Sequence, residues 1–178
     1  MEKIEFELES VCPLKMDKWQ DGLQPKTPDE YKKQAEGKIY TDEKGYISIP
    51  STSLKAALKL AASELSDSQK KYTGKKMRQS ISAQVFIQPA NMKILPETKK
   101  HNGIIQDIVT RGMGDKVTRV TTFRPIINKW KIKGTLNYLG LSSKFLKEAL
   151  ELAGFKYALL SHRPEFGRFI ITKFQEVK

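Results

Sequence analysis

The sequence predicts an α+β fold in which strands and helices follow one another in the order β-α-β-β-α-β. Two observations lead to this prediction. Apolar and polar residues alternate in three segments, which is typical of strands with one buried face, and apolar residues recur at helical spacing in two others. This order is that of the ferredoxin-like or RRM-like core, an antiparallel sheet with two helices on one face. The 178 residues suffice for a single domain, 1–178, with two insertions.

The first strand is predicted at residues 4–9, where apolar residues alternate with glutamates. An insertion at about 15–45 follows and contains a short helix. Thr27 is the predicted N-cap, Glu30 completes a capping box, and Gly37 ends the helix. Because few of its residues are apolar, we expect this helix at the periphery of the fold.

The first core helix is predicted from Leu54 to Leu65, where apolar residues follow one helical face. Pro50 is expected to end the preceding strand, and one of the hydroxyl residues 51–53 to cap the helix. The amides of the first turn would then form a small anion site. The next segment, KKYTGKKMRQ (70–79), predicts a mobile basic loop, which is either a phosphate clamp or a soluble linker.

The two middle strands are predicted at 81–88 and 130–138 from their alternating apolar residues. Between them lies the second insertion, a basic excursion at about 89–125. Its segment TRGMGDKVTRV has two glycines flanked by β-branched residues. This pattern predicts a basic, thumb-like hairpin that projects from the sheet.

The second core helix is predicted from Ser142, its N-cap, to Ala153, with Gly154 as the stop. The segment GRFIITKF (167–174) supplies the last strand. Aromatic residues at strand spacing are expected in the core rather than stacked on bases.

Positive charge is concentrated in one part of the chain. The net charge is +12, and all of the excess lies within residues 69–133, which contain fifteen Lys or Arg and three acidic residues. A solvated surface usually mixes both signs. The imbalance therefore favours a polyanionic partner that is bound through its phosphates.

Several classes of site are disfavoured by the composition. The single Cys12 cannot form an internal disulfide, and with two histidines it falls short of a zinc-binding pattern, so we expect no metal and no cofactor. No apolar run approaches the roughly 20 residues that cross a bilayer, and the N-terminus does not resemble a signal peptide. We therefore expect a cytoplasmic protein without a membrane partner.

Three segments carry a resemblance to a known family. Residues 42–62, DEKGYISIPSTSLKAALKLAA, resemble the signature of the RAMP superfamily, in particular the Cas seven-like backbone subunits of CRISPR effector complexes. FELESVCPL near the start and ELAGFKYALLSHRPEFGRF near the end resemble, in the same order, the family's first strand and its closing helix, loop and strand. The chain has Thr52 and Ala56 where the family commonly has glycine. It would be a small, virus-encoded or stand-alone relative.

The resemblance implies a single RAMP-like domain that binds single-stranded RNA, such as a guide or crRNA, through the RNA backbone. The protein would act as a homo-oligomer or as a subunit of a ribonucleoprotein. Backbone contacts give affinity without reading bases, so binding should weaken steeply with salt. The residues at the matched motif are Ser51, Thr52, Ser53, Lys55 and Lys59.

The resemblance also implies that the basic excursion corresponds to the thumb hairpin of the family. The candidate contacts there are Arg111, Lys116, Arg119 and Arg124. Phe123 lies beside Arg124, is expected to be exposed, and is the candidate for stacking on a base. The remaining basic candidates are Lys75, Lys76 and Arg78 in segment 70–79 and Arg163 and Arg168 in the closing loop.

Catalysis is not the expectation, although two residues are weak candidates for it. Some relatives cleave RNA with an aspartate close to the position of Asp42, and others use a histidine, for which His162 is the candidate. An acidic residue beside a glycine is also a common turn former, and a loop histidine is commonly a plain surface residue. If the protein is an enzyme, we expect an endoribonuclease.

Two further alternatives remain open at this point. The protein could be a viral mimic of a CRISPR backbone subunit, an anti-CRISPR that binds protein rather than RNA. It could equally be a viral protein that binds or anneals single-stranded DNA, because a basic groove for DNA would leave similar marks in the sequence. Competition between RNA and DNA distinguishes the second alternative from RNA binding.

Overall fold

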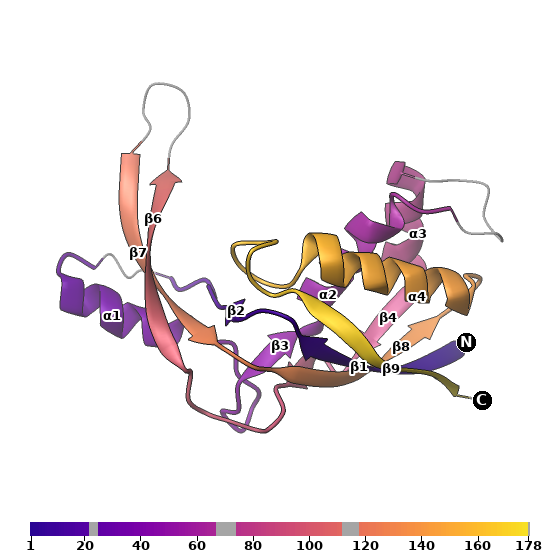
Figure 1. Ribbon diagram of the computed structural model, residues 1–178, viewed down its shortest axis with the longest axis horizontal. Helices are drawn as coiled ribbons and strands as arrows, with labels where there is room; N and C mark the ends of the chain where they lie inside the picture. Colours follow the sequence, from indigo (N-terminus) through magenta and orange to yellow (C-terminus); the bar gives the residue numbers. More distant parts are fainter. Residues whose placement is uncertain (22–24, 67–73, 112–117, 178) are drawn as a thin grey trace.

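The computed structural model describes residues 1–21, 25–66, 74–111 and 118–177, and it confirms an α+β fold with antiparallel sheets (Figure 1). In chain order the elements are β1 (Glu2–Ser10), β2 (Leu14–Lys15), α1 (Pro28–Gly37), β3 (Ser48–Pro50), α2 (Ser51–Ala62), α3 (Gly74–Gln84), β4 (Val85–Gln88), β5 (Asn91–Lys93), β6 (Gly103–Arg111), β7 (Thr118–Ile127), β8 (Lys131–Tyr138), α4 (Ser143–Leu152), the π-helical turn η1 (Ala153–Tyr157) and β9 (Phe169–Val177).

The largest sheet has four strands in the order β4-β8-β1-β9, and all its pairs are antiparallel. Helices α2 and α4 lie on one side of it (Figure 1). The predicted alternation in β1 is confirmed, because Ile4, Phe6 and Leu8 are buried in the core. The glutamates between them point to the opposite face, where lysines of β8 and β9 pair with them.

A hairpin of β6 and β7 projects away from this sheet, as the sequence predicts (Figure 1). The two strands pair from Gly103 opposite Ile126 to Arg111 opposite Thr118. Strand β2 extends the hairpin to a second sheet in the order β2-β7-β6, and β3 pairs with β5. The hairpin therefore joins the rest of the fold at its base.

Local sequence signals predict the starts of α1 and α4 correctly. Thr27 caps α1 with the predicted capping box, in which its hydroxyl accepts from the Glu30 amide and the Glu30 carboxylate accepts from the Thr27 amide. Ser142 caps α4 by accepting from the Phe145 amide. The predicted apolar face of α2 is also confirmed, because its buried residues are Leu54, Ala57, Leu58, Ala61 and Ala62.

Two predictions between residues 70 and 88 are wrong. Residues 74–79 of the predicted basic loop belong to helix α3, and 70–73 lie outside the described residues. The strand predicted at 81–88 begins only at Val85. Met77 and Ile81 are four apart and both buried, so a helix gives them one common face against the core.

Gly154 does not stop a helix as predicted, because the chain continues through it in the π-helical turn η1. Its position is explained by close packing against β9. A Cβ atom on Gly154 would lie 2.2 Å from the carbonyl oxygen of Phe169 and 2.9 Å from the Phe169 ring. Glycine, which has no Cβ atom, therefore allows η1 and β9 to approach each other closely at this position.

Gly154→Ala is expected to destabilise the protein by roughly 1–3 kcal/mol, because the added methyl group forces η1 away from β9. Urea unfolding would measure the change. Gly103→Ala is the matched control, since its Cβ would meet only the Ile126 side chain at 3.9 Å and should leave stability nearly unchanged. Equal stability of the Gly154→Ala variant and the wild type would contradict the close approach.

Candidate nucleic-acid interface

The N-terminus of α2 differs from the predicted arrangement. The N-cap is Pro50, and no side chain caps the helix. The Ser51 amide donates to the carbonyl of Ala90 at 2.8 Å, and the Ser53 hydroxyl accepts from the Leu160 amide at 3.1 Å. Ser53 therefore holds the closing loop against α2 instead of capping the helix. The Thr52 side chain is exposed, and its amide belongs to the first turn, where N–H groups have no partner within the helix.

Two hollows flank this helix start, and Thr52 lines both of them. The larger, of about 780 Å³, lies toward β4 and includes Ser51, Lys55 and Phe86 in its lining. The smaller, of about 460 Å³, lies toward the closing loop and includes Ser53 and Arg163. The structure thus places most residues of the predicted motif around one surface.

Lys55 and Lys59 follow on the same helix, one turn apart and away from its buried stripe. The Lys55 ammonium donates to the carbonyl of Ser82 at 2.8 Å. Burial lowers the pKa of Lys55, and the charge of Lys59 lowers it further. Among the described residues, no carboxylate pairs with either lysine. An anion beside them would relieve this repulsion.

The closing loop, residues 158–168, has an unusual backbone. Ala158, Leu160 and His162 have positive φ angles of 54°, 59° and 56°, a region that residues other than glycine rarely adopt. Several hydrogen bonds hold this conformation, among them one from the Leu159 amide to the Gly167 carbonyl at 3.0 Å. Strained backbone of this kind is concentrated at functional sites.

The charged residues of this loop have different roles. Arg163 is exposed at the smaller hollow, beside the start of α2. Arg168 is directed elsewhere, because its guanidinium lies 5.6 Å from the Phe155 ring centre and lines a separate hollow. The structure therefore brings Arg163 to the candidate interface and leaves Arg168 outside it.

His162 lies beside a cluster of buried charges rather than a reactive nucleophile. Its Nε2 is 3.9 Å from Asp107, and its Nδ1 shares a hydrogen bond with the Ser161 hydroxyl at 3.1 Å. Burial and then the charge of Lys15 lower the pKa of His162, and Asp107 offsets this only in part. The imidazole is therefore neutral near pH 7.

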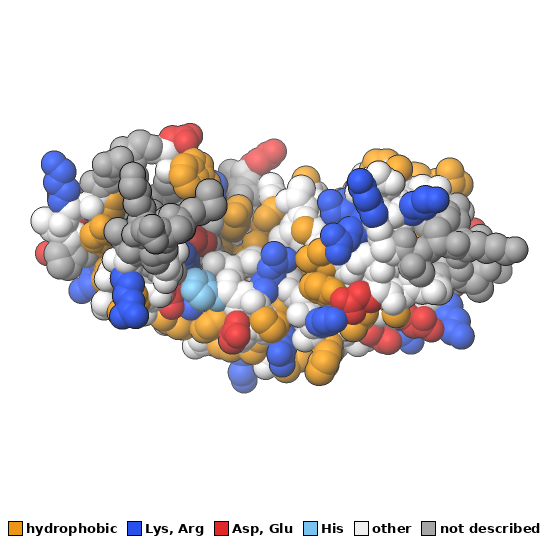
Figure 2. Space-filling view, turned by 90° about the horizontal axis from the view of Figure 1, so that it is seen from above, with side chains coloured by type: hydrophobic (Ala, Val, Ile, Leu, Met, Phe, Trp, Pro, Cys, Tyr) orange, Lys and Arg blue, Asp and Glu red, His pale blue; other side chains and the backbone are white. Residues whose placement is uncertain are grey.

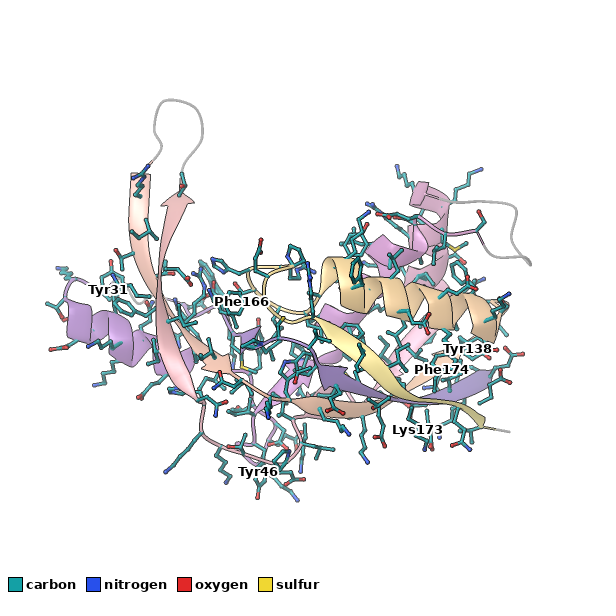
Figure 3. The ribbon with its side chains drawn as sticks, in the orientation of Figure 1. Tyr31, Tyr46, Tyr138, Phe166, Lys173 and Phe174 are labelled. Carbon is teal, nitrogen blue, oxygen red and sulfur yellow. The ribbon has the colours of Figure 1, made fainter. Side chains whose placement is uncertain are left out.

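The buried charges form a network that no sequence motif marks. Lys15, with 2% of its side chain exposed, donates to Asp107 at 2.9 Å, and its ammonium lies 3.9 Å from the Phe166 ring centre. Figure 3 shows Phe166 between the hairpin and the helical layer. Arg124 donates to Asp107 and to Asp17 at 3.2 and 2.7 Å. These residues, called the hairpin-base cluster below, connect β2, β6 and β7.

Two predictions for the hairpin are wrong for the same reason. Phe123 is buried, 9% exposed, and its ring contacts Tyr31 of α1 at a centroid distance of 6.1 Å. Arg124 is 6% exposed and belongs to the hairpin-base cluster. Both lie in the part of β7 that α1 and β2 pack against. Neither side chain is available to a nucleic acid in this conformation.

The other basic candidates lie apart from the start of α2. Arg119 is exposed on β7, Arg111 is the last residue of β6, and Lys116 lies outside the described residues. Lys75, Lys76 and Arg78 are exposed on α3. Figure 2, which looks onto the helix-covered side, shows basic side chains gathered over the helical part of this face.

The basic stretch of residues 69–133 does not lie on one surface. Lys131 and Lys133 of the basic stretch lie on the other face of the sheet, where they pair with Glu9 and Glu7 at 3.1 and 2.9 Å. Lys93 pairs with Glu97. The same alternation that buries one face of β1 places its glutamates opposite these lysines, so this face is neutralised.

Asp42 forms a turn of its own rather than part of either hollow. Its Oδ1 accepts from the amides of Tyr46 and Lys44 at 2.9 and 3.0 Å. Burial raises its pKa, but these hydrogen bonds and the charge of Lys93 outweigh burial and lower it. The turn interpretation of Asp42 accounts for all these contacts.

Neither a metal cluster nor a membrane span is found in the described part of the chain. No group of three or more potential metal ligands occurs there. Within the same residues, no helix has the length and apolar character needed to span a membrane.

Comparison with known proteins yields a similarity of structure only. No protein-family model and no curated protein matches the sequence. A chain in the cryo-EM structure of the Type III-B Cmr-beta bound to cognate target RNA has a TM-score of 0.57 and 11% sequence identity to this chain. The match covers 99% of this chain and 61% of that chain. This chain thus spans about three fifths of the length of its structural neighbour, and the two share a fold.

Proposed function

We propose that this protein binds single-stranded RNA through the RNA backbone, as a RAMP-like subunit of a CRISPR-type ribonucleoprotein. The observation that carries the proposal is the surface at the start of α2, where two hollows meet at Thr52 beside Lys55, Lys59 and Arg163, three charges without an ion-pair partner among the described residues. The same segment carries the family resemblance, and the similar structure comes from a complex bound to target RNA.

The finer assignment of the fold belongs to this proposal. We propose that β1, α2, β4, β8, α4 and β9 form a ferredoxin-like core within a single RAMP-like domain, 1–178, and that the β6–β7 hairpin acts as a thumb. The β-α-β-β-α-β order of these elements and the sheet order β4-β8-β1-β9 support the core. Arg111 and Arg119 on the hairpin would then extend the interface.

Salt dependence is the first test of this function. We expect the dissociation constant for a fluorescent 30-nucleotide RNA to rise with salt, because each phosphate contact releases counterions. Three lysine or arginine contacts predict a slope of about −2 in a plot of log affinity against log salt concentration. Anisotropy titrations between low and physiological salt would measure this slope. A slope near zero would contradict backbone binding.

Competing functions give different results in the same assays. Protein purified without nuclease should retain RNA, which its 260 to 280 nm absorbance ratio and sequencing would reveal. Stronger competition by single-stranded DNA would favour the DNA-binding alternative. Cleavage of labelled RNA that is lost in His162→Ala or Asp42→Ala would indicate an endoribonuclease. Salt-insensitive association with an effector complex, without RNA binding, would favour a viral mimic.

A further inference from the structure

Phe86 is an exposed aromatic residue on an edge strand, beside the larger hollow. In β4 the side chains alternate, so that Val85 and Ile87 are buried whereas Phe86 is 53% exposed and Gln88 is also exposed. Strand β4 pairs only with β8 in the four-stranded sheet. The Phe86 ring therefore presents apolar surface to water at a sheet edge, and a ligand could cover this surface.

The surroundings of this ring are cationic and polar. The Lys55 ammonium lies 5.2 Å from the ring centre and is held there by the Ser82 carbonyl. Asn137 of β8 lies directly opposite Phe86, and its amide donates to the Gln88 side-chain oxygen at 3.2 Å. Among the described residues, the Gln88 NH₂ group and the Asn137 carbonyl oxygen have no other partner. Asn137 is itself buried and fixes the Gln88 carboxamide, whose NH₂ group is left as a donor next to the aromatic ring.

We propose that this hollow binds one nucleobase of the RNA strand, stacked on Phe86, with the carboxamide of Gln88, which lines the hollow, facing its polar edge. The inference rests on the proposed function and adds a base contact to binding through the backbone. An aromatic ring, a hydrogen-bonding side chain and a cation are elements that proteins use to bind unstacked bases of single strands. Thr52 and Lys55, which line the same hollow, connect it to the phosphate-binding surface.

Phe155 is a second exposed aromatic residue with a cation beside it, but its surroundings differ from those of Phe86. Phe155 is 72% exposed, and the Arg168 guanidinium lies 5.6 Å from its ring centre. Its hollow is lined by η1 and β9, at the opposite edge of the sheet from β4, and does not include residues of α2. Phe155 is therefore the matched control for Phe86.

The test uses a 20-nucleotide oligouridylate and a backbone of equal length in which the bases are absent. Phe86→Ala should weaken oligouridylate binding roughly tenfold, because one stacking contact is lost, and should leave binding of the abasic backbone and the salt slope unchanged. Phe86→Trp should restore affinity, and Phe155→Ala should bind like the wild type. An oligonucleotide with 2-aminopurine should lose fluorescence on binding the wild type but not Phe86→Ala.

The outcomes separate this inference from the function on which it rests. If Phe86→Ala binds oligouridylate as tightly as the wild type, while charge reversal of Lys55 and Lys59 abolishes binding, the base site is wrong and backbone binding stands. If Phe86→Ala weakens binding of the abasic backbone as much as binding of oligouridylate, base stacking on Phe86 is also wrong. If the wild type binds neither probe, both proposals fail. If Phe86→Ala instead loses association with a protein partner, the hollow is a peptide site and the inference is wrong.

Gln88→Ala tests the polar part of the site separately. The wild type should distinguish among homopolymers of uridine, cytidine and adenosine, because the Gln88 carboxamide fits some base edges better than others. Gln88→Ala should reduce this difference while keeping the affinity that stacking supplies. Equal affinity of the wild type for all three homopolymers would overturn the contact with the base edge.

Discussion

Asp107→Ala is expected to lower the free energy of unfolding by about 3–5 kcal/mol, because it leaves the buried ammonium of Lys15 without its counterion. Lys15 is 2% exposed, and both carboxylate oxygens of Asp107 accept from it, at 2.9 and 3.1 Å. Arg124 would keep its contact with Asp17. The loss of stability therefore reflects mainly the unpaired charge of Lys15. Urea unfolding at pH 7 would measure this loss.

The pH dependence of stability gives a second measurement of the same contact. Burial raises the pKa of Asp107, but the hydrogen bond and charge of Lys15 and the hydrogen bond from Arg124 outweigh it, so the pKa is lower than its ordinary value of 3.8. A carboxyl group whose pKa is lowered by folding stabilises the protein above its unfolded pKa and loses this contribution as pH falls through the folded pKa. The stability difference between wild type and Asp107→Ala should thus shrink in strong acid.

Two further variants test whether the loss of stability comes from the buried charge. Glu97→Ala removes a carboxylate from an exposed pair with Lys93 and should change stability little, because water screens that pair. Lys15→Met combined with Asp107→Leu removes both buried charges and should be more stable than Asp107→Ala alone. A double variant as unstable as the single one would show that the cluster matters through packing and not through charge.

The hairpin-base cluster also shows why part of this structure escapes sequence patterns. Lys15 and Asp107 are separated by 92 positions, and neither has a neighbour in sequence that indicates an ion pair. Capping boxes, amphipathic stripes and strand alternation are local, and these are the features that predict α1, α2, α4, β1 and β8 correctly. Helix α3 escapes prediction because only Met77 and Ile81 mark its buried apolar face in an otherwise polar segment.

The candidate interface is likewise only partly predictable from the sequence. Ser51 to Lys59 lie within one helix, so a single motif places them together. Arg163 joins them only because Ser53 binds the Leu160 amide across 107 positions. The basic stretch predicts Phe123 and Arg124 as contacts, whereas tertiary packing by α1 and β2 buries them. Burial of a strand face depends on which element covers it, which local sequence does not determine.

The result that bears most directly on function is expected from Lys55→Glu combined with Lys59→Glu. RNA affinity should fall roughly 10- to 100-fold at low salt, because two attractive phosphate contacts become repulsive. The slope of log affinity against log salt should become shallower by about 1.4, the value for two contacts to a single strand. Anisotropy titrations with the 30-nucleotide RNA would measure both quantities.

The matched control changes the net charge equally at another place. Lys144 and Lys147 are exposed on α4, and their replacement by glutamate alters the overall field without touching either hollow at the start of α2. At 0.1 M salt, where surface charges are screened beyond about 10 Å, this control should bind RNA nearly as well as the wild type. If both double variants lose the same affinity, attraction is a property of the whole basic surface. If neither loses affinity, the RNA is bound elsewhere, and Arg119, which is exposed on the hairpin, becomes the next residue to reverse.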